Sequence, residues 1–153
     1  MNLQAIQQLH RNTNFGMSEC KKALISANGN YEKALLILKE KGRISAKQRV
    51  YRLTRNGIIS HYVHDNLQLA VLVEIHCETE VAASTKVFKD FAQEIAMHIA
   101  AEQPKDIPTL LNQPYYKEES ISVEEFIFEF IALLRENIII KRFVCFEIGK
   151  NYE

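Results

Sequence analysis

The sequence predicts an α+β protein, with a three-helix bundle at the N-terminus followed by an antiparallel three-stranded sheet packed with helices. Apolar residues recur at helical spacing over residues 1–42 and are interrupted by turn residues. From Gly57 the apolar residues alternate instead, as they do in a half-buried strand. Residues 138–148 are rich in β-branched and aromatic side chains, which predicts a closing strand.

Three short amphipathic helices are predicted in the N-terminal bundle. The first carries apolar residues three positions apart from Leu3 to Leu9. The second is expected to follow Ser18, whose hydroxyl suits an N-cap, and to end at Asn28-Gly29. The third is expected to end before Gly42. The side chains predicted to face inward from the second and third helices are Cys20, Ala23, Leu24, Ala27, Tyr31, Ala34, Leu35 and Leu38.

The second half of the chain predicts the element order β-β-α-α-β. Residues 58–64 and 67–75 form two alternating strands joined by a tight turn at Asp65-Asn66. Residues 85–101 carry a strong apolar stripe at helical spacing, and Pro104 and Pro108 end this helix and start a loop. Ser122 and Glu125 form a capping-box pattern that opens the next helix.

The composition narrows the class of protein. The chain has 153 residues, of which 47% are apolar and 25% charged, as in soluble globular proteins. Its formal net charge is zero, which argues against a nucleic-acid partner. We expect no membrane partner, because no run approaches the roughly 18 apolar residues of a bilayer span, and we expect no signal or transit peptide. Three widely spaced cysteines fit reduced thiols in a cytosol-like compartment.

The residues predict no catalytic centre, no metal site and no cofactor. Metal-ligand spacings and glycine-rich phosphate loops are missing from the sequence. Cys77 lies beside His76, but neighbouring residues on a strand point to opposite faces, so a nucleophile–base pair is not expected. We therefore predict a protein that is not an enzyme.

A basic segment separates the two modules. Residues 43–55 carry several positive charges and no negative one. We predict a three-helix domain at 1–42, a basic linker at 43–55 and an α+β core module at 56–153. The linker is either a solvated connection with snorkelling side chains or a basic arm that contacts an acidic partner surface.

Residues 76–84 join the second strand to the long helix. We expect a loop there, fixed at both ends by rigid elements, where functional residues often lie. Glu78 and Glu80 lie on either side of Thr79. Their carboxylates either complement the helix N-terminus or belong to a binding site.

The N-terminal bundle resembles the opening domain of translation elongation factor Ts. The matching runs are Gly16-Met17, Cys20-Lys21-Lys22-Ala23-Leu24 and Ala27-Asn28-Gly29. The resemblance implies a ubiquitin-associated-type domain that grips the nucleotide-binding domain of elongation factor Tu. The partner-binding residues it implies here are Asn12, Met17, Cys20 and Lys21. Asn12 stands where the family commonly has an arginine, and Phe15 stands where a small residue is usual.

The segment after the second strand is similar to the C-x-T-D-F-V-A motif of the same family. The matching residues are Cys77, Thr79, Glu80, Val81, Ala82 and Ala83. The resemblance implies that Thr79, Glu80, Val81 and Ala82 press into the partner beside its magnesium and phosphate sites. Glu80 replaces the family's aspartate, and Val81 replaces its phenylalanine, a smaller wedge.

Further segments continue the resemblance in order along the chain. Residues 97–101 are similar to the family's M-H-x-A-A segment, which implies that His98 lies on the partner-facing surface, although a lone helical histidine is more often structural. Residues 112–117, 135–138 and 146–149 are similar to the family's closing segments. The chain is identified as a short form with one core module, and its exposed sheet edge implies a homodimer.

The resemblance implies a guanine nucleotide exchange factor that acts on elongation factor Tu in its GDP-bound and nucleotide-free states. It implies no cofactor, no bond chemistry, and a place in a bacterial cytoplasm or an organelle stroma or matrix such as that of a plastid. An alternative is a ubiquitin-associated-type protein-binding adaptor without exchange activity.

Overall fold

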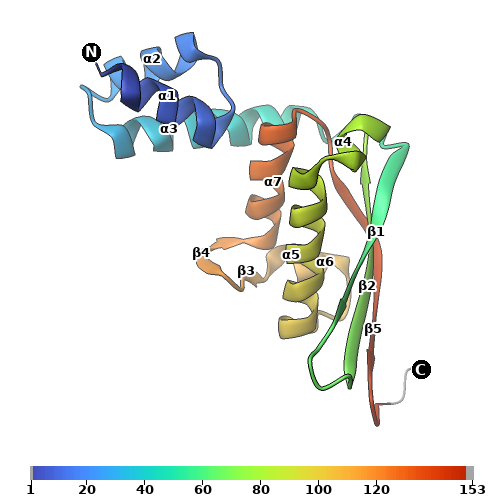
Figure 1. The fold of residues 1–153 in the computed structure, drawn as a ribbon. Helices are drawn as coiled ribbons and strands as arrows, with labels where there is room; N and C mark the ends of the chain where they lie inside the picture. Colours follow the sequence, from blue (N-terminus) through green and yellow to red (C-terminus); the bar gives the residue numbers. More distant parts are fainter. Residues whose placement is uncertain (1, 151–153) are drawn as a thin grey trace.

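The computed structural model describes residues 2–150. It is an α+β fold in which an N-terminal helical bundle precedes a three-stranded antiparallel sheet with its helices, as predicted (Figure 1). The bundle consists of α1 (Leu3–Thr13), α2 (Met17–Ser26) and α3 (Tyr31–Gln48). Its buried core contains Ile6, Leu9, Cys20, Ala23, Leu24, Ala27, Ala34 and Leu38.

Of the local signals that predicted the ends of α2, one is confirmed and one is not. Asn28 and Gly29 follow α2 with φ angles of 51° and 79°, the left-handed conformation expected of a helix stop. The N-cap prediction for Ser18 was wrong. The helix begins at Met17, two residues earlier than a cap at Ser18 implies, and Gly16 occupies the cap position without a side-chain hydrogen bond. Leu3, the first residue of the predicted apolar spacing in this bundle, is 60% exposed.

Helix α3 does not end before Gly42, as predicted, but continues to Gln48. Gly42 packs against α7 (Val123–Leu134), where an added Cβ atom would lie 3.1 Å from the Cβ of Ala132. The glycine therefore permits a close helix crossing rather than a stop. Because Ala46 is buried in the main core, the first part of the expected linker is packed helix, and Figure 1 shows α3 reaching across the top of α7. A domain boundary at residue 42 stays a prediction.

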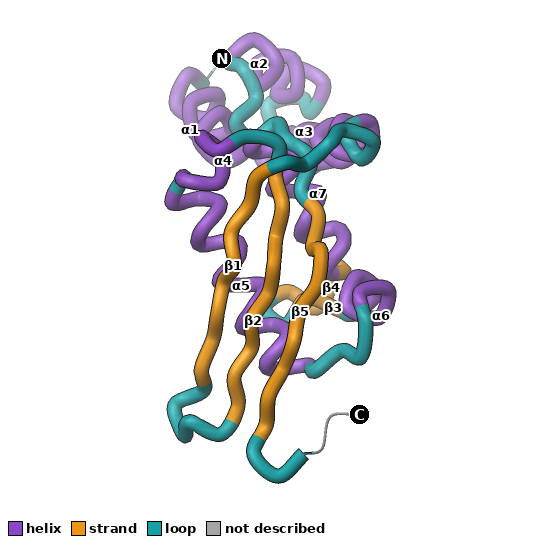
Figure 2. Tube along the Cα trace, turned by 90° about the vertical axis from the view of Figure 1, so that its right-hand side faces the viewer, coloured by secondary structure: helices purple, strands orange, loops and turns teal. Residues whose placement is uncertain are grey.

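The sheet has the strand order β1-β2-β5, with both pairs antiparallel. Its strands are β1 (Asn56–Val63), β2 (Leu69–Cys77) and β5 (Ile139–Glu147). The hairpin register pairs Asn56 with Cys77 at one end and Val63 with Ala70 at the other. In Figure 2 the strands face the viewer and the helices lie behind them, so one face of the sheet is open.

The helices α5 (Lys86–Glu102) and α7 cover the other face. Phe88, Phe91, Ile95 and Ile99 of α5 are fully buried against the sheet. The predicted order lacked α4 (Glu80–Ser84), α6 (Ile107–Asn112) and the small hairpin β3 (Pro114–Tyr115) and β4 (Glu118–Ser122). The capping box of Ser122 and Glu125 at the start of α7 is confirmed. Within residues 2–150, the helices are all too short or too polar to cross a membrane.

Candidate partner-binding surface

The predicted contact segment is not a loop but the end of a strand followed by a short helix. Strand β2 ends at Cys77, and Thr79 caps α4 by accepting a hydrogen bond from the Ala82 N–H at 3.2 Å. Helix α4 begins at Glu80 and is followed directly by α5. We refer to Thr79, Glu80 and Val81 as the tip. Its backbone is therefore held in a regular structure rather than in an irregular connection.

The tip side chains point to solvent, whereas the residues that follow point inward. Val81 is 77% exposed, and Thr79 and Glu80 are also exposed. Ala82, predicted as a partner-binding residue, is only 6% exposed and packs in the main core together with Ala83. The side chain of Ala82 is buried, contrary to the prediction, because a short helix that packs on a core turns one face inward, and Ala82 lies on that face.

A network of hydrogen bonds holds Glu78 and Thr79, the first residue of the tip. The Glu136 carboxylate accepts from the backbone N–H groups of Glu78 and Thr79, both at 2.9 Å, and from the Thr79 hydroxyl at 2.6 Å. The Glu78 carboxylate in turn accepts from the Asn137 backbone N–H at 2.8 Å. The Asn56 side chain donates to the Glu78 carbonyl at 2.9 Å. The resemblance covered residues 135–138 but assigned them no role, and no periodicity in the sequence marks Glu136 as a partner of Thr79.

Cys77 and His76 do not form a catalytic pair. Cys77 is fully buried, and its thiol donates to the Thr79 carbonyl at 3.3 Å. Burial, together with the nearby Glu136 charge, raises the pKa of this thiol, which lowers its reactivity. The ring of His76 is bound instead to the Glu74 carboxylate at 2.7 Å, on the open face of the sheet.

His98 is completely buried, which contradicts the expected place on the partner-facing surface. The Tyr116 backbone N–H donates to Nδ1 at 3.2 Å, so Nε2 carries the proton and donates to the Gln113 side chain at 2.9 Å. Burial lowers the pKa of this imidazole. The residues that contact the histidine, Gln113, Tyr115 and Tyr116, come from the segment between α6 and β4, which agrees with a structural role for His98.

The bundle residues predicted to bind a partner fall into two groups. Met17 is 39% exposed, and Lys21 and Asn12 are also exposed. Asn12 donates from its side chain to the Tyr31 hydroxyl at 2.8 Å. Cys20 is fully buried in the bundle core, where burial raises its pKa, so a direct contact by this side chain is ruled out in this conformation. Cys20 instead helps to hold the three helices together.

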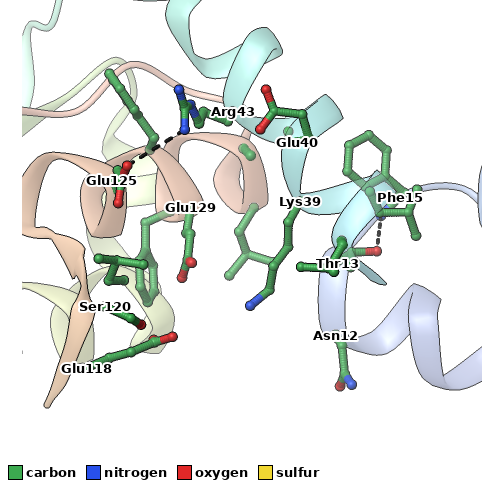
Figure 3. Close-up of a pocket in the computed structure, with 18 residues that line it drawn as sticks. Asn12, Thr13, Phe15, Lys39, Glu40, Arg43, Glu118, Ser120, Glu125 and Glu129 are labelled. Carbon is green, nitrogen blue, oxygen red and sulfur yellow. Dashed lines mark hydrogen bonds and ion pairs between the residues drawn. The ribbon is translucent and has the colours of Figure 1, made fainter. Parts of the chain in front are cut away.

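A groove with a volume of about 550 Å³ lies between α3, α7 and β4 (Figure 3). Phe15 and Phe128 line it together with charged side chains, of which Arg43 and Glu125 are paired at 3.7 Å. Asn12 is the one predicted site residue that lines it, and the tip lies elsewhere. Among residues 2–150, no group of three or more His, Cys, Asp or Glu side chains is arranged to hold a metal ion.

Comparison with known proteins identifies the family. The family model described as elongation factor Ts matches residues 4–108. Elongation factor Ts of Thermoanaerobacter sp. (strain X514) is 35% identical over 195 aligned positions, which cover 98% of this chain and 96% of that protein. The same-named proteins of Caldanaerobacter subterraneus subsp. tengcongensis and Carboxydothermus hydrogenoformans are 34% and 35% identical, with 98% and 96% of this chain covered and 98% and 88% of theirs.

The alignments with these relatives are longer than the 153 residues of this chain, so they contain positions that it lacks. They nevertheless run through both the bundle and the α+β core. With the family model matching more than half of the chain, the finding is plain: this chain belongs to the elongation factor Ts family.

Proposed function

We propose that this chain is a guanine nucleotide exchange factor for elongation factor Tu in translation elongation. The observation that carries the proposal is the position of Val81. It is 77% exposed at the start of a helix whose other face is buried, at the place where the family motif has its wedge. A largely exposed apolar side chain on a firmly held backbone is suited to burial in a partner.

The proposed mechanism needs two surfaces. The exposed residues Met17, Lys21 and Asn12 of the bundle bind the nucleotide-binding domain and keep the factor in place. The tip then inserts beside the magnesium and phosphate sites. The Glu80 carboxylate competes electrostatically for the ligand shell of the magnesium ion, and Val81 displaces the elements that hold the phosphates. The tip is smaller than the family's usual aspartate–phenylalanine pair, so a matching partner pocket is part of the proposal.

Exchange by this route is a matter of linked binding equilibria. If the factor binds nucleotide-free elongation factor Tu more tightly than the GDP-bound form, then bound GDP lowers the affinity of elongation factor Tu for the factor, and the bound factor lowers its affinity for GDP by the same ratio. Release of GDP lets GTP bind, and GTP then displaces the factor. No bond is made or broken by this chain, and the mechanism uses no cofactor and no catalytic residue.

The test is the release of a fluorescent GDP analogue from elongation factor Tu of the same source, with and without this chain. Acceleration supports the proposal. Stable binding without acceleration contradicts exchange and favours the alternative of a protein-binding adaptor. A parallel pull-down against ubiquitin separates these two readings, because an adaptor of the ubiquitin-associated type should retain ubiquitin rather than elongation factor Tu.

A homodimer is the second part of the proposal. The open face of the sheet carries Ile59, Leu72, Val144 and Phe146, which are 65%, 48%, 40% and 59% exposed. Leu72 and Val144 are cross-strand partners and Phe146 lies two residues further along β5, so these three form an apolar patch that a second copy can cover with two-fold symmetry. Ile59 lies on the same face, opposite Glu74. This argument favours pairing through the open face rather than through the sheet edge expected from the sequence.

The oligomeric state tests the homodimer directly. Light scattering should give a dimer for the natural chain and a monomer for Leu72→Glu. The matched control is Leu3→Glu, which places the same change at a 60% exposed leucine in the bundle and should leave the dimer intact. A natural chain that is monomeric at high concentration contradicts the proposed homodimer.

The relatives reported above are bacterial, which supports a bacterial cytoplasm as the site of action.

A further inference from the structure

We propose that Glu136 is a positioning residue for nucleotide exchange, which holds the tip in the orientation that presents Glu80 and Val81 to the partner. This inference rests on the proposed function and adds to it a residue that lies outside the motif. Glu136 lies between α7 and β5, 55 or more residues beyond the tip in the sequence, yet its carboxylate is the main acceptor for the residues that lead into α4.

Both oxygens of the Glu136 carboxylate are used. Oε1 accepts from the backbone N–H groups of Glu78 and Thr79, and Oε2 accepts from the Thr79 hydroxyl at 2.6 Å. Hydrogen bonds to a charged acceptor are shorter and stronger than neutral ones. The three donors belong to the two residues that immediately precede Glu80, so they determine the direction in which the chain enters α4.

The hydroxyl of Thr79 has two tasks that depend on its orientation. It donates its proton to Glu136 and accepts from the Ala82 N–H, which caps α4. A glutamine at position 136 keeps one carbonyl oxygen for the backbone N–H groups but offers an amide donor to the hydroxyl. The hydroxyl proton then loses its acceptor, so Glu136→Gln should loosen the tip without removing the side chain.

The residue that follows Glu136 is bonded to the segment before β1. Asn137, only 1% exposed, donates from its side chain to the carbonyls of Val50 and Arg52 at 3.3 and 2.9 Å, and its backbone N–H donates to the Glu78 carboxylate. Arg52 also lies 3.7 Å from that carboxylate. The turn after α7 is thus tied to the segment before β1, and the tip rests on a connected framework rather than on a single contact.

The same turn is bonded to the bundle. The Arg135 side chain donates to the Asn14 carbonyl at 3.2 Å, and the Asn14 side chain donates to the Leu133 carbonyl at 2.9 Å. Residues 133–137 therefore join the surface that grips the partner to the tip that inserts into it. This arrangement lets binding of the bundle determine where Glu80 and Val81 arrive.

The test compares the full chain with Glu136→Ala, Glu136→Gln and Thr79→Val in fluorescent-GDP release, measured over a range of factor concentrations. A positioning role predicts that the maximal release rate falls about tenfold or more for Glu136→Ala and severalfold for Glu136→Gln. The concentration of factor at half-maximal rate should change much less, because the bundle contacts remain. Glu119→Gln, the same change at an exposed glutamate of β4, should match the natural chain.

A double variant tests whether Glu136 acts through Thr79, and urea denaturation of each variant checks separately for general destabilisation. If Glu136 acts through Thr79, then Glu136→Gln combined with Thr79→Val should release GDP no more slowly than the slower single variant. Additive losses overturn the proposal, as does a folded Glu136→Ala variant that exchanges at the natural rate. Failure of the proposed function looks different, because the natural chain itself then fails to accelerate release.

Discussion

Truncation of Val81 to alanine should lower exchange efficiency about eightfold and leave the stability of the chain unchanged. The substitution removes two methyl groups, worth about 1.6 kcal/mol at roughly 0.8 kcal/mol for each buried carbon. Because Val81 is 77% exposed in the free chain, about three quarters of that value, roughly 1.2 kcal/mol, is available for burial in the partner. At about 1.4 kcal/mol per factor of ten, this corresponds to a loss of roughly eightfold.

The assay is the rate of fluorescent-GDP release from elongation factor Tu at factor concentrations well below saturation. The matched control is Val87→Ala, the same truncation at a 40% exposed valine on α5, which should retain the natural efficiency within about twofold. Urea denaturation should place Val81→Ala within about 0.5 kcal/mol of the natural chain. Full activity of Val81→Ala, or an equal loss in Val87→Ala, would refute the assignment of Val81 as the wedge.

Three further predictions concern stability. Gly57→Ala should destabilise the chain by about 1–3 kcal/mol in urea denaturation, because the added Cβ atom would lie 2.2 Å from the Ile75 carbonyl oxygen; an unchanged midpoint contradicts that close contact. Leu67→Gly should raise the thermal midpoint and increase the free energy of unfolding by up to about 1 kcal/mol, because Leu67 is 78% exposed and has a φ angle of 60° that glycine adopts without strain. A lower midpoint would show that the Leu67 side chain contributes more stability than its strained backbone costs. The free energy of unfolding should fall as the pH drops below about 6.5, because burial holds the pKa of His98 below its value in the unfolded chain, and the unfolded chain therefore binds more protons in this range. The dependence of this free energy on pH should be shallower in His98→Gln. An equal dependence in both chains assigns the effect to other groups.

Features that depend on a few neighbouring residues were predictable. The capping box at the start of α7 needs only Ser122 and Glu125, which are three residues apart and satisfy each other's backbone groups. The stop at Asn28-Gly29 depends on the low cost of positive φ at those residues. The strands β1 and β2 follow from the alternation of apolar residues, since one face of each is buried.

Features that depend on a segment distant in the sequence could not be predicted. Gly42 is compatible with both a helix stop and a close helix crossing, and Ala132 of α7 decides for the crossing. His98 lies on the buried face of α5, and its burial depends on Gln113 and Tyr116, which contact it from the segments that follow α5. Such outcomes require knowledge of which surfaces meet, and the period of one helix does not contain that information.

The sequence by itself determined the α+β class, the family resemblance and the motif that contains Glu80 and Val81. These depend on local propensity, hydrophobic period and residue identity, all of which are properties of short stretches. Only the tertiary structure decided that Ala82, Cys20 and His98 are buried and that the tip is held by Glu136. The burial of these side chains depends on the packing of the whole core. The hydrogen bonds of Glu136 form because that packing places the turn between α7 and β5 beside the end of β2.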